Sequence, residues 1–144
     1  MLKSDKPIIV KKSFAVAKAL VWKAITSAPE MQKWFFEEIS DFEPKVGFET
    51  QFSISHDGKT YTHIWKVLEA TPEEKLVCDW TYKGVAGRGK VTWELSTQDG
   101  ETLLTLTSQA TESFPQDDPA FHRESALDGW EYLINELLPE HLES

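Results

Sequence analysis

The stretch from Leu76 to Ala110, LVCDWTYKGVAGRGKVTWELSTQDGETLLTLTSQA, decides the fold because its apolar and polar residues alternate in three successive runs. Alternation with a period of two is typical of strands that bury one face and expose the other. The pair Asp99-Gly100 separates the last two runs, and this dipeptide favours a tight hairpin turn. Three antiparallel strands are therefore predicted, with these side chains on the core face: Leu76, Cys78, Trp80, Tyr82, Val91, Trp93, Leu95, Leu104 and Leu106.

Further strands are predicted on the N-terminal side of this stretch. Residues 48–55 alternate in the same way, and Asp57-Gly58 then makes a hairpin turn into the run from Tyr61 to Leu68. That run is rich in β-forming residues but apolar on both sides of the pleat, so the pattern leaves its inward face open. Ile8 to Phe14 is also rich in β-formers and predicts the first strand.

Helical spacing appears in two short segments and one long one. Ala15 to Ile25 and the segment from Ser27 to Phe36 predict two short helices, the second with a capping serine and a proline near its first position. The longest helix is predicted from about Pro119 to Leu138, with Asp118 as its cap, and Pro139 is expected to stop or kink it. Its apolar stripe consists of Phe121, Leu127, Trp130, Ile134, Leu137 and Leu138.

This order of elements predicts an α+β fold in which a curved antiparallel sheet wraps one long C-terminal helix. With 144 residues and 40% apolar residues, the chain suits a single domain, residues 1–144, with one core. The formal net charge of −9 opposes binding to nucleic acid or to an anionic membrane surface. The single cysteine, Cys78, excludes an intrachain disulfide, and no signal-peptide or membrane-spanning stretch is evident, so we expect a cytoplasmic protein. A monomer or a homodimer is expected.

A hollow is expected between sheet and helix, because one helix about 10 Å wide cannot fill the concave side of a twisted sheet. An aromatic and aliphatic lining would suit a small apolar molecule. The alternative, that these large side chains simply fill the space as packed core, stays open. The predicted ligand-binding residues are Trp34, Phe52, Ile54, Cys78, Trp80, Trp93, Leu106, Trp130, Leu133 and Ile134. Trp34 is expected at the mouth, together with Phe35 as a further candidate.

Polar chemistry is sparse in the pattern. The four histidines lack metal-ligand spacing, so no metal site or cofactor is expected. His63 could be a general base if it pointed inward, but the pattern favours a solvent-facing histidine. The segment from Gly84 to Lys90 links two strands and is interpreted as a hairpin loop rather than a phosphate loop, with Arg88 solvated by default. Cys78 is interpreted as inert packing, and no catalytic residue is predicted.

Five sequence segments, taken together and in their order along the chain, identify a family more specifically than any one of them does alone. They are Ala19–Glu30 with Trp34-Phe35, Val67–Val77 leading to Trp80, Val91–Leu95, Thr102–Thr107, and Gly129-Trp130. Together they resemble the START-like (polyketide cyclase and birch-pollen allergen) superfamily, and within it proteins similar to the C-terminal domain of the activator of the heat-shock protein 90 ATPase. The resemblance implies a helix-grip fold, commonly with a hydrophobic cavity between sheet and helix.

The same superfamily includes ligand carriers, cyclases, stress-related proteins and chaperone activators, so the fold does not select one function. The chain also departs from the pattern, since Thr107-Ser108-Gln109 stands where many relatives have a histidine after the threonine, and the usual glycine pair is reduced to Gly47. Three hypotheses follow. The first is non-enzymatic binding of a small apolar or aromatic molecule, the second is a protein-binding module for a chaperone or other protein, and the third is a cyclase-like or hydrolytic enzyme using His63 or Arg88.

Overall fold

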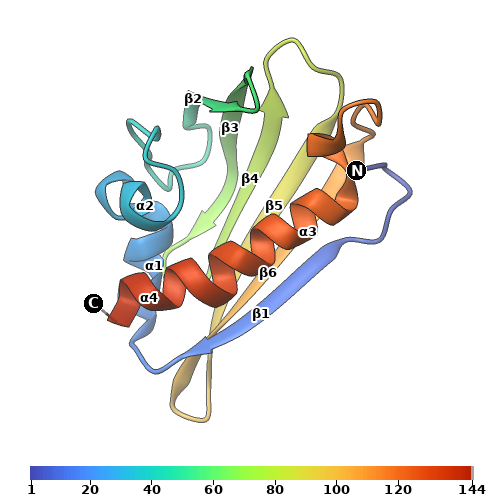
Figure 1. Cartoon of the computed structure of the whole chain (residues 1–144). Helices are drawn as coiled ribbons and strands as arrows, with labels where there is room; N and C mark the ends of the chain where they lie inside the picture. The colour runs from blue at the N-terminus through green and yellow to red at the C-terminus, as the bar shows by residue number, and fades with distance from the viewer. Residues whose placement is uncertain (144) are drawn as a thin grey trace.

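The computed structural model describes residues 1–143, in which six strands form one antiparallel sheet in the order β1-β6-β5-β4-β3-β2. Figure 1 shows this sheet with the C-terminal helix running across one of its faces. The predicted α+β helix-grip fold is confirmed. The elements are β1 (Ile8–Phe14), α1 (Lys18–Thr26), α2 (Ala28–Trp34), β2 (Glu49–His56), β3 (Lys59–Thr71), β4 (Lys75–Tyr82), β5 (Arg88–Gln98), β6 (Glu101–Glu112), the 3-10 turn η1 (Pro119–Phe121), α3 (Arg123–Tyr132), the π-helical η2 (Leu133–Leu137) and α4 (Leu138–Glu143).

Strand order follows from one long crossover and a meander. After β1 the chain passes through α1 and α2 to the opposite edge of the sheet, and β2 to β6 then return strand by strand until β6 pairs with β1, with Leu106 opposite Val10. Both Asp-Gly pairs make the predicted hairpin turns. Asp57 and Gly58 have φ of 50° and 77°, and Asp99 and Gly100 have φ of 51° and 79°, as a two-residue turn matched to twisted strands requires.

The structure shows which side of strand β3 faces the core, a point that its sequence pattern left open. A bulge between Val67 and Glu69 leaves Leu68 unpaired and exposed, and it shifts the alternation from odd to even positions. On the N-terminal side of the bulge, His63, Trp65 and Val67 are buried. His63 therefore points towards the core, and the prediction of a solvent-facing histidine was wrong.

The C-terminal helix differs from its prediction at both ends. Asp118 accepts a hydrogen bond from the Ala120 N–H as predicted, but it caps a single 3-10 turn, and α3 begins only at Arg123. Pro139 does not end the helix. It cannot donate a backbone hydrogen bond, and just before it the helix widens into η2, where the Leu138 N–H donates to the Leu133 carbonyl five residues back.

The two short helices meet at Ser27, which ends α1 and precedes α2. Its side chain makes no capping hydrogen bond, contrary to the prediction, whereas its backbone N–H donates to the Lys23 carbonyl and its own carbonyl accepts from Met31. Pro29 lies in the first turn, as predicted. Figure 1 shows α1 and α2 beside α4, so they cover one end of the groove between the sheet and the long helix.

The core lies between the concave face and the helices. Ile134 and Leu138 of the C-terminal helix are completely buried, and Leu104 and Leu106 are completely buried beneath them on β6. Together with the aromatic side chains of α2, β3, β4 and β5 they form one hydrophobic cluster. None of the helices in residues 1–143 combines the length and the hydropathy that spanning a bilayer requires.

Candidate functional site

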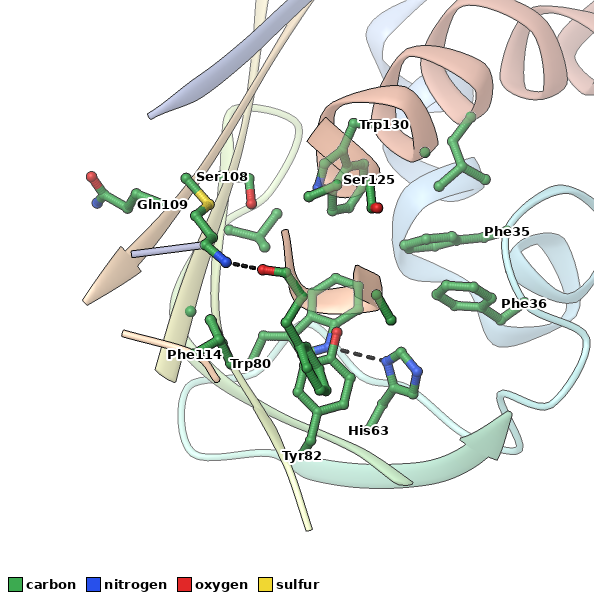
Figure 2. Close-up of a pocket in the computed structure, with 18 residues that line it drawn as sticks. Phe35, Phe36, His63, Trp80, Tyr82, Ser108, Gln109, Phe114, Ser125 and Trp130 are labelled. Atoms are coloured by element: carbon green, nitrogen blue, oxygen red, sulfur yellow. Dashed lines mark hydrogen bonds between the residues drawn. The ribbon is translucent and has the colours of Figure 1, made fainter. Parts of the chain in front are cut away.

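A cavity of about 210 Å³ lies between the sheet and the N-terminal half of the long helix. Figure 2 shows its aromatic walls: Trp130 from α3, Phe35 and Phe36 from the segment after α2, and Trp80 and Tyr82 from β4. Within the described residues, no Asp, Glu, Lys or Arg side chain lines it. The remaining lining residues are Met1, His63, Gly89, Val91, Ser108, Gln109, Phe114, Ala120, Phe121, Ser125, Ala126, Gly129 and Leu133.

The cavity exists because small residues face large ones. Gly89 lies opposite Trp80 in the sheet, and Gly129 carries no side chain where the helix passes over the same space. A Cβ atom added at Gly129 would meet no atom within 4 Å. Ser108, Ala120, Ser125 and Ala126 also contribute little volume, so the large rings around them cannot close the gap.

The aromatic walls are braced by ring contacts at right angles. Trp130 stands edge-on to both Trp80 and Trp93, with ring centroids 5.8 Å and 5.6 Å away. Phe35 packs against Trp130 and stacks on Phe36 at 4.5 Å. Edge-to-face and offset contacts are the favoured geometries of aromatic pairs, so they stabilise this arrangement of the cavity wall.

His63 is the polar centre of the site. It lies on β3 in a cross-strand row between Phe52 of β2 and Tyr82 of β4. Its ring stacks on Phe52 at 5.0 Å and 10°, and its Nδ1 accepts a hydrogen bond from the Trp80 Nε1–H at 3.1 Å. Burial lowers the pKa of His63 to about 4, since a charged imidazolium would lose its hydration there. The imidazole is therefore neutral at physiological pH.

The mouth of the cavity is covered by the segment between β6 and α3. Phe114 and Phe121 of this segment stack at 5.7 Å and 10°, and Phe121 meets Tyr82 edge-on at 5.1 Å. Met1 is tied to the same segment, because the Phe114 N–H donates to its carbonyl oxygen at 2.9 Å. Burial raises the pKa of the Tyr82 phenol, while the Trp80 side chain acts in the opposite sense, so Tyr82 stays protonated.

A second, outer hollow of about 700 Å³ adjoins the cavity. The two share seven lining residues, including His63, Tyr82 and Phe121. Its rim is charged, where Tyr61 donates to Asp118 at 2.8 Å and the Lys59 ammonium lies 3.5 Å from the same carboxylate. The Ala120 N–H and then Tyr61 hold the pKa of Asp118 below its usual range. An apolar chamber therefore opens through a polar entrance.

The structure divides the predicted ligand-binding residues into four groups. Trp80, Trp130 and Leu133 line the cavity, as does Phe35, and Ile54 lines the outer hollow. Cys78 and Trp93 border, with Trp80, a separate void of about 10 Å³ that is no larger than one water. The other four belong to the packed core and line neither hollow: Trp34, Phe52, Leu106 and Ile134.

Sequence reasoning missed most of the mouth. Tyr82 was on the core face of its strand, so its alternation was an available signal. Phe121 was predicted at the start of the helical apolar stripe, but it lies in the separate 3-10 turn η1. Phe36 and Phe114 lie in irregular segments, where no periodicity marks the inward side. Ser125 and Gly129 are small residues on the exposed side of the apolar stripe, and a cavity wall made by a missing side chain leaves no positive signal.

The glycine-containing hairpin between β4 and β5 packs against the mouth. A Cβ at Gly87, where φ is 108°, would lie 2.6 Å from the Phe114 ring, so the hairpin fits only without a side chain there. Arg88 is not merely solvated, which corrects the default interpretation. Its guanidinium pairs with Asp79 and, at 3.4 Å, with Glu112. Desolvation nevertheless leaves the pKa of Asp79 above its usual range, with Arg88 opposing that rise.

Two other groups bear on chemistry. Cys78 is buried, and burial raises its pKa to about 12, so it remains a thiol at neutral pH. Residues 1–143 contain no cluster of three or more His, Cys, Asp or Glu side chains placed to hold a metal ion.

Comparison with known proteins gives a family match and a set of similar folds. The family model described as "Activator of Hsp90 ATPase homolog 1-like protein" matches residues 15–143. A protein from Chromobacterium violaceum has a similar structure, with a TM-score of 0.78 and 15% identity over 96% of this chain and 97% of that chain. An HSP90 activator from Plasmodium falciparum aligns with a TM-score of 0.75 and 16% identity over 96% of this chain and 97% of that chain.

DynU16, a protein in the dynemicin biosynthetic locus, is also similar, with a TM-score of 0.74 and 22% identity. The alignment covers 97% of this chain but 48% of DynU16, so the present chain spans about half of that protein. At these identities the likeness establishes the fold and nothing more. No curated protein matches the chain in sequence.

Proposed function

The chain belongs to the activator of Hsp90 ATPase homolog 1-like family, and we propose that it binds a small, uncharged, largely aromatic molecule in the cavity between the sheet and α3. The observation that carries this proposal is the cavity of about 210 Å³, walled by Trp80, Trp130 and Phe35 and free of charged side chains in the described residues. Pockets for drug-sized ligands hold about 300–1,000 Å³, so the ligand expected here has one or two rings.

The proposal favours binding over catalysis. A general base needs a group that orients it and a free basic nitrogen towards the substrate. The Nδ1 of His63 already accepts the Trp80 N–H, and no carboxylate lines the cavity beside it in the described part of the chain. Arg88 is engaged by Asp79 and Glu112 and does not line the cavity. These arrangements support a carrier or sensor of a small molecule rather than an enzyme.

Fluorescence titration tests the proposal directly. The protein is unfolded in denaturant, freed of any bound molecule, refolded, and titrated with a panel of one- and two-ring aromatic compounds. Because Trp80 and Trp130 form the walls, occupation of the cavity should change the indole emission in a saturable way. Absence of a saturable response across the panel, checked by calorimetry, contradicts the proposal.

A cavity-filling variant locates the binding. Gly129→Leu places a side chain in open space at the cavity, and replacing a helical glycine also favours folding by roughly 0.5–1 kcal/mol. We expect this variant to be at least as stable as the wild type and to lose binding. Asp128→Leu is the matched control, because Asp128 is exposed on the same helix and does not line the cavity. Equal loss of binding in both variants contradicts the assignment of the site.

The family description and the fold shared with the HSP90 activator favour a second candidate, a chaperone-type protein partner bound on an outer surface. It is tested by pull-down with the chaperone and by its ATPase rate with and without the protein. A partner on the outer surface would tolerate Gly129→Leu, whereas a cavity ligand would not. The variant therefore separates the two candidates.

A further inference from the structure

The hydrogen bond between Trp80 and His63 determines which nitrogen of the imidazole carries its proton. An indole N–H is a donor only, so the Nδ1 that receives it must offer a lone pair. A neutral imidazole has one N–H, and that N–H is therefore on Nε2. The second ring nitrogen of this lining residue is therefore a hydrogen-bond donor.

This donor has no partner within residues 1–143. Among the described residues, the hydrogen bond that the His63 side chain makes is the one that Nδ1 accepts from Trp80. His63 as a whole is only 8% exposed, and it lines both the inner cavity and the outer hollow. Figure 2 shows its imidazole beside Trp80, at one end of an otherwise aromatic chamber.

We propose that the Nε2–H of His63 is the specificity-determining donor of this site and that it selects a neutral aromatic ligand bearing a carbonyl acceptor, such as an aryl ketone, quinone or ester. The inference rests on the proposed ligand-binding function and names its ligand class. In the unoccupied protein this N–H is satisfied by water, and a ligand that displaces the water must replace that hydrogen bond. A carbonyl oxygen does so, and a hydrocarbon does not.

The absence of charged side chains from the described lining of the cavity narrows the expected ligand class to neutral molecules. Neither a basic side chain that would pair with a carboxylate nor an acidic one that would pair with an amine lines the cavity in the described residues. The net charge of −9 also repels anions from the molecule as a whole. An amine would lose its hydration in the chamber without gaining an acidic partner. A carboxylate would meet, among the described lining residues, the Met1 ammonium, which already donates to the Phe121 carbonyl, whereas a neutral carbonyl compound loses little hydration.

Matched probes test the selectivity. The ketone 2-acetylnaphthalene and the alkene 2-isopropenylnaphthalene have nearly the same planar shape and differ in C=O against C=CH2, while 2-naphthoate carries a charge. We expect the wild type to bind the ketone roughly ten- to a hundredfold more tightly than the alkene, the cost of leaving a buried donor unpaired, and to bind 2-naphthoate more weakly than the ketone. Equal affinity for ketone and alkene overturns the inference but leaves the proposed function standing. Binding of neither overturns both.

Two substitutions assign the selectivity to one atom. His63→Phe keeps an aromatic ring against Phe52 but has no N–H, so the ketone should lose its advantage over the alkene. His63→Gln keeps an amide N–H near the Nε2 position and should restore part of it. Tyr132→Phe is the control, because it also removes a phenol, but from an exposed residue that lines neither hollow, and it should leave the preference in place. Selectivity that survives His63→Phe, or that is lost equally in Tyr132→Phe, overturns the assignment.

Nuclear magnetic resonance of the wild type gives a result that does not depend on the folding of any variant. Selective ¹⁵N labelling of histidine should show His63 protonated at Nε2, with a downfield shift of its Nε2–H resonance on adding the ketone and none on adding the alkene. A proton on Nδ1, or an unchanged resonance with bound ketone, contradicts the inference.

Discussion

Acidification should destabilise the fold through His63. In the unfolded chain this imidazole has its ordinary pKa of 6.5, whereas burial lowers it to about 4 in the folded protein. Between these values the unfolded state binds the proton more readily than the folded state. The contribution of the neutral His63 to the free energy of unfolding is therefore fully present above about pH 6.5. It falls as the pH drops and is lost, with no further change, below about pH 4.

The size of the effect follows from the same pKa values. One pKa unit corresponds to about 1.4 kcal/mol, so the full loss is about 3 kcal/mol, of which roughly 2 kcal/mol falls between pH 7 and pH 5. With a urea dependence of about 1–3 kcal/mol per molar, that loss lowers the unfolding midpoint by about 1 M. Such a shift is large compared with the error of a denaturation curve.

Urea unfolding followed by circular dichroism at pH 7, 6 and 5 measures this loss. His63→Gln is the comparison, because its amide oxygen can accept the Trp80 N–H while the side chain does not titrate. Subtracting the two profiles removes the contribution of the other carboxylates and histidines. If the wild type and His63→Gln lose the same stability between pH 7 and pH 5, the reasoning about the buried neutral imidazole is refuted.

Two further predictions concern stability. Gly87→Ala should lower the free energy of unfolding by roughly 1–3 kcal/mol, because its Cβ would meet the Phe114 ring at 2.6 Å and φ is 108°. Gly100→Ala, which has open space around it, should lower the free energy of unfolding by less. Thermal melting of the two variants measures the difference. Trp34→Phe should lower the free energy of unfolding by about 1 kcal/mol more than Trp65→Phe does. The first substitution removes the hydrogen bond that Trp34 donates to the Ala24 carbonyl at 2.8 Å, whereas the buried Trp65 N–H has no partner among the described residues. Equal melting temperatures within either pair would contradict its explanation.

Only a small part of the candidate site was predictable, and the reason is local. Trp80 and Trp130 carried clear periodicities, one on an alternating strand and one on a helical stripe, and both line the cavity. Leu106 was on a core face as well and Trp34 was expected at the mouth, but both are buried in the packed core. Periodicity predicts which side of an element faces inward. It does not say how far another element lies above it.

What the sequence by itself determined was the set of elements and most of their faces, because alternation, Asp-Gly turns and a helical stripe are properties of neighbouring residues. Tertiary structure alone decided that His63 points inward, since a bulge at Leu68 follows a run that is apolar on both sides. It also decided the cavity, which Gly89 of the sheet and Gly129 of the helix both line. An empty volume is set by groups distant in the chain, so no local pattern encodes it.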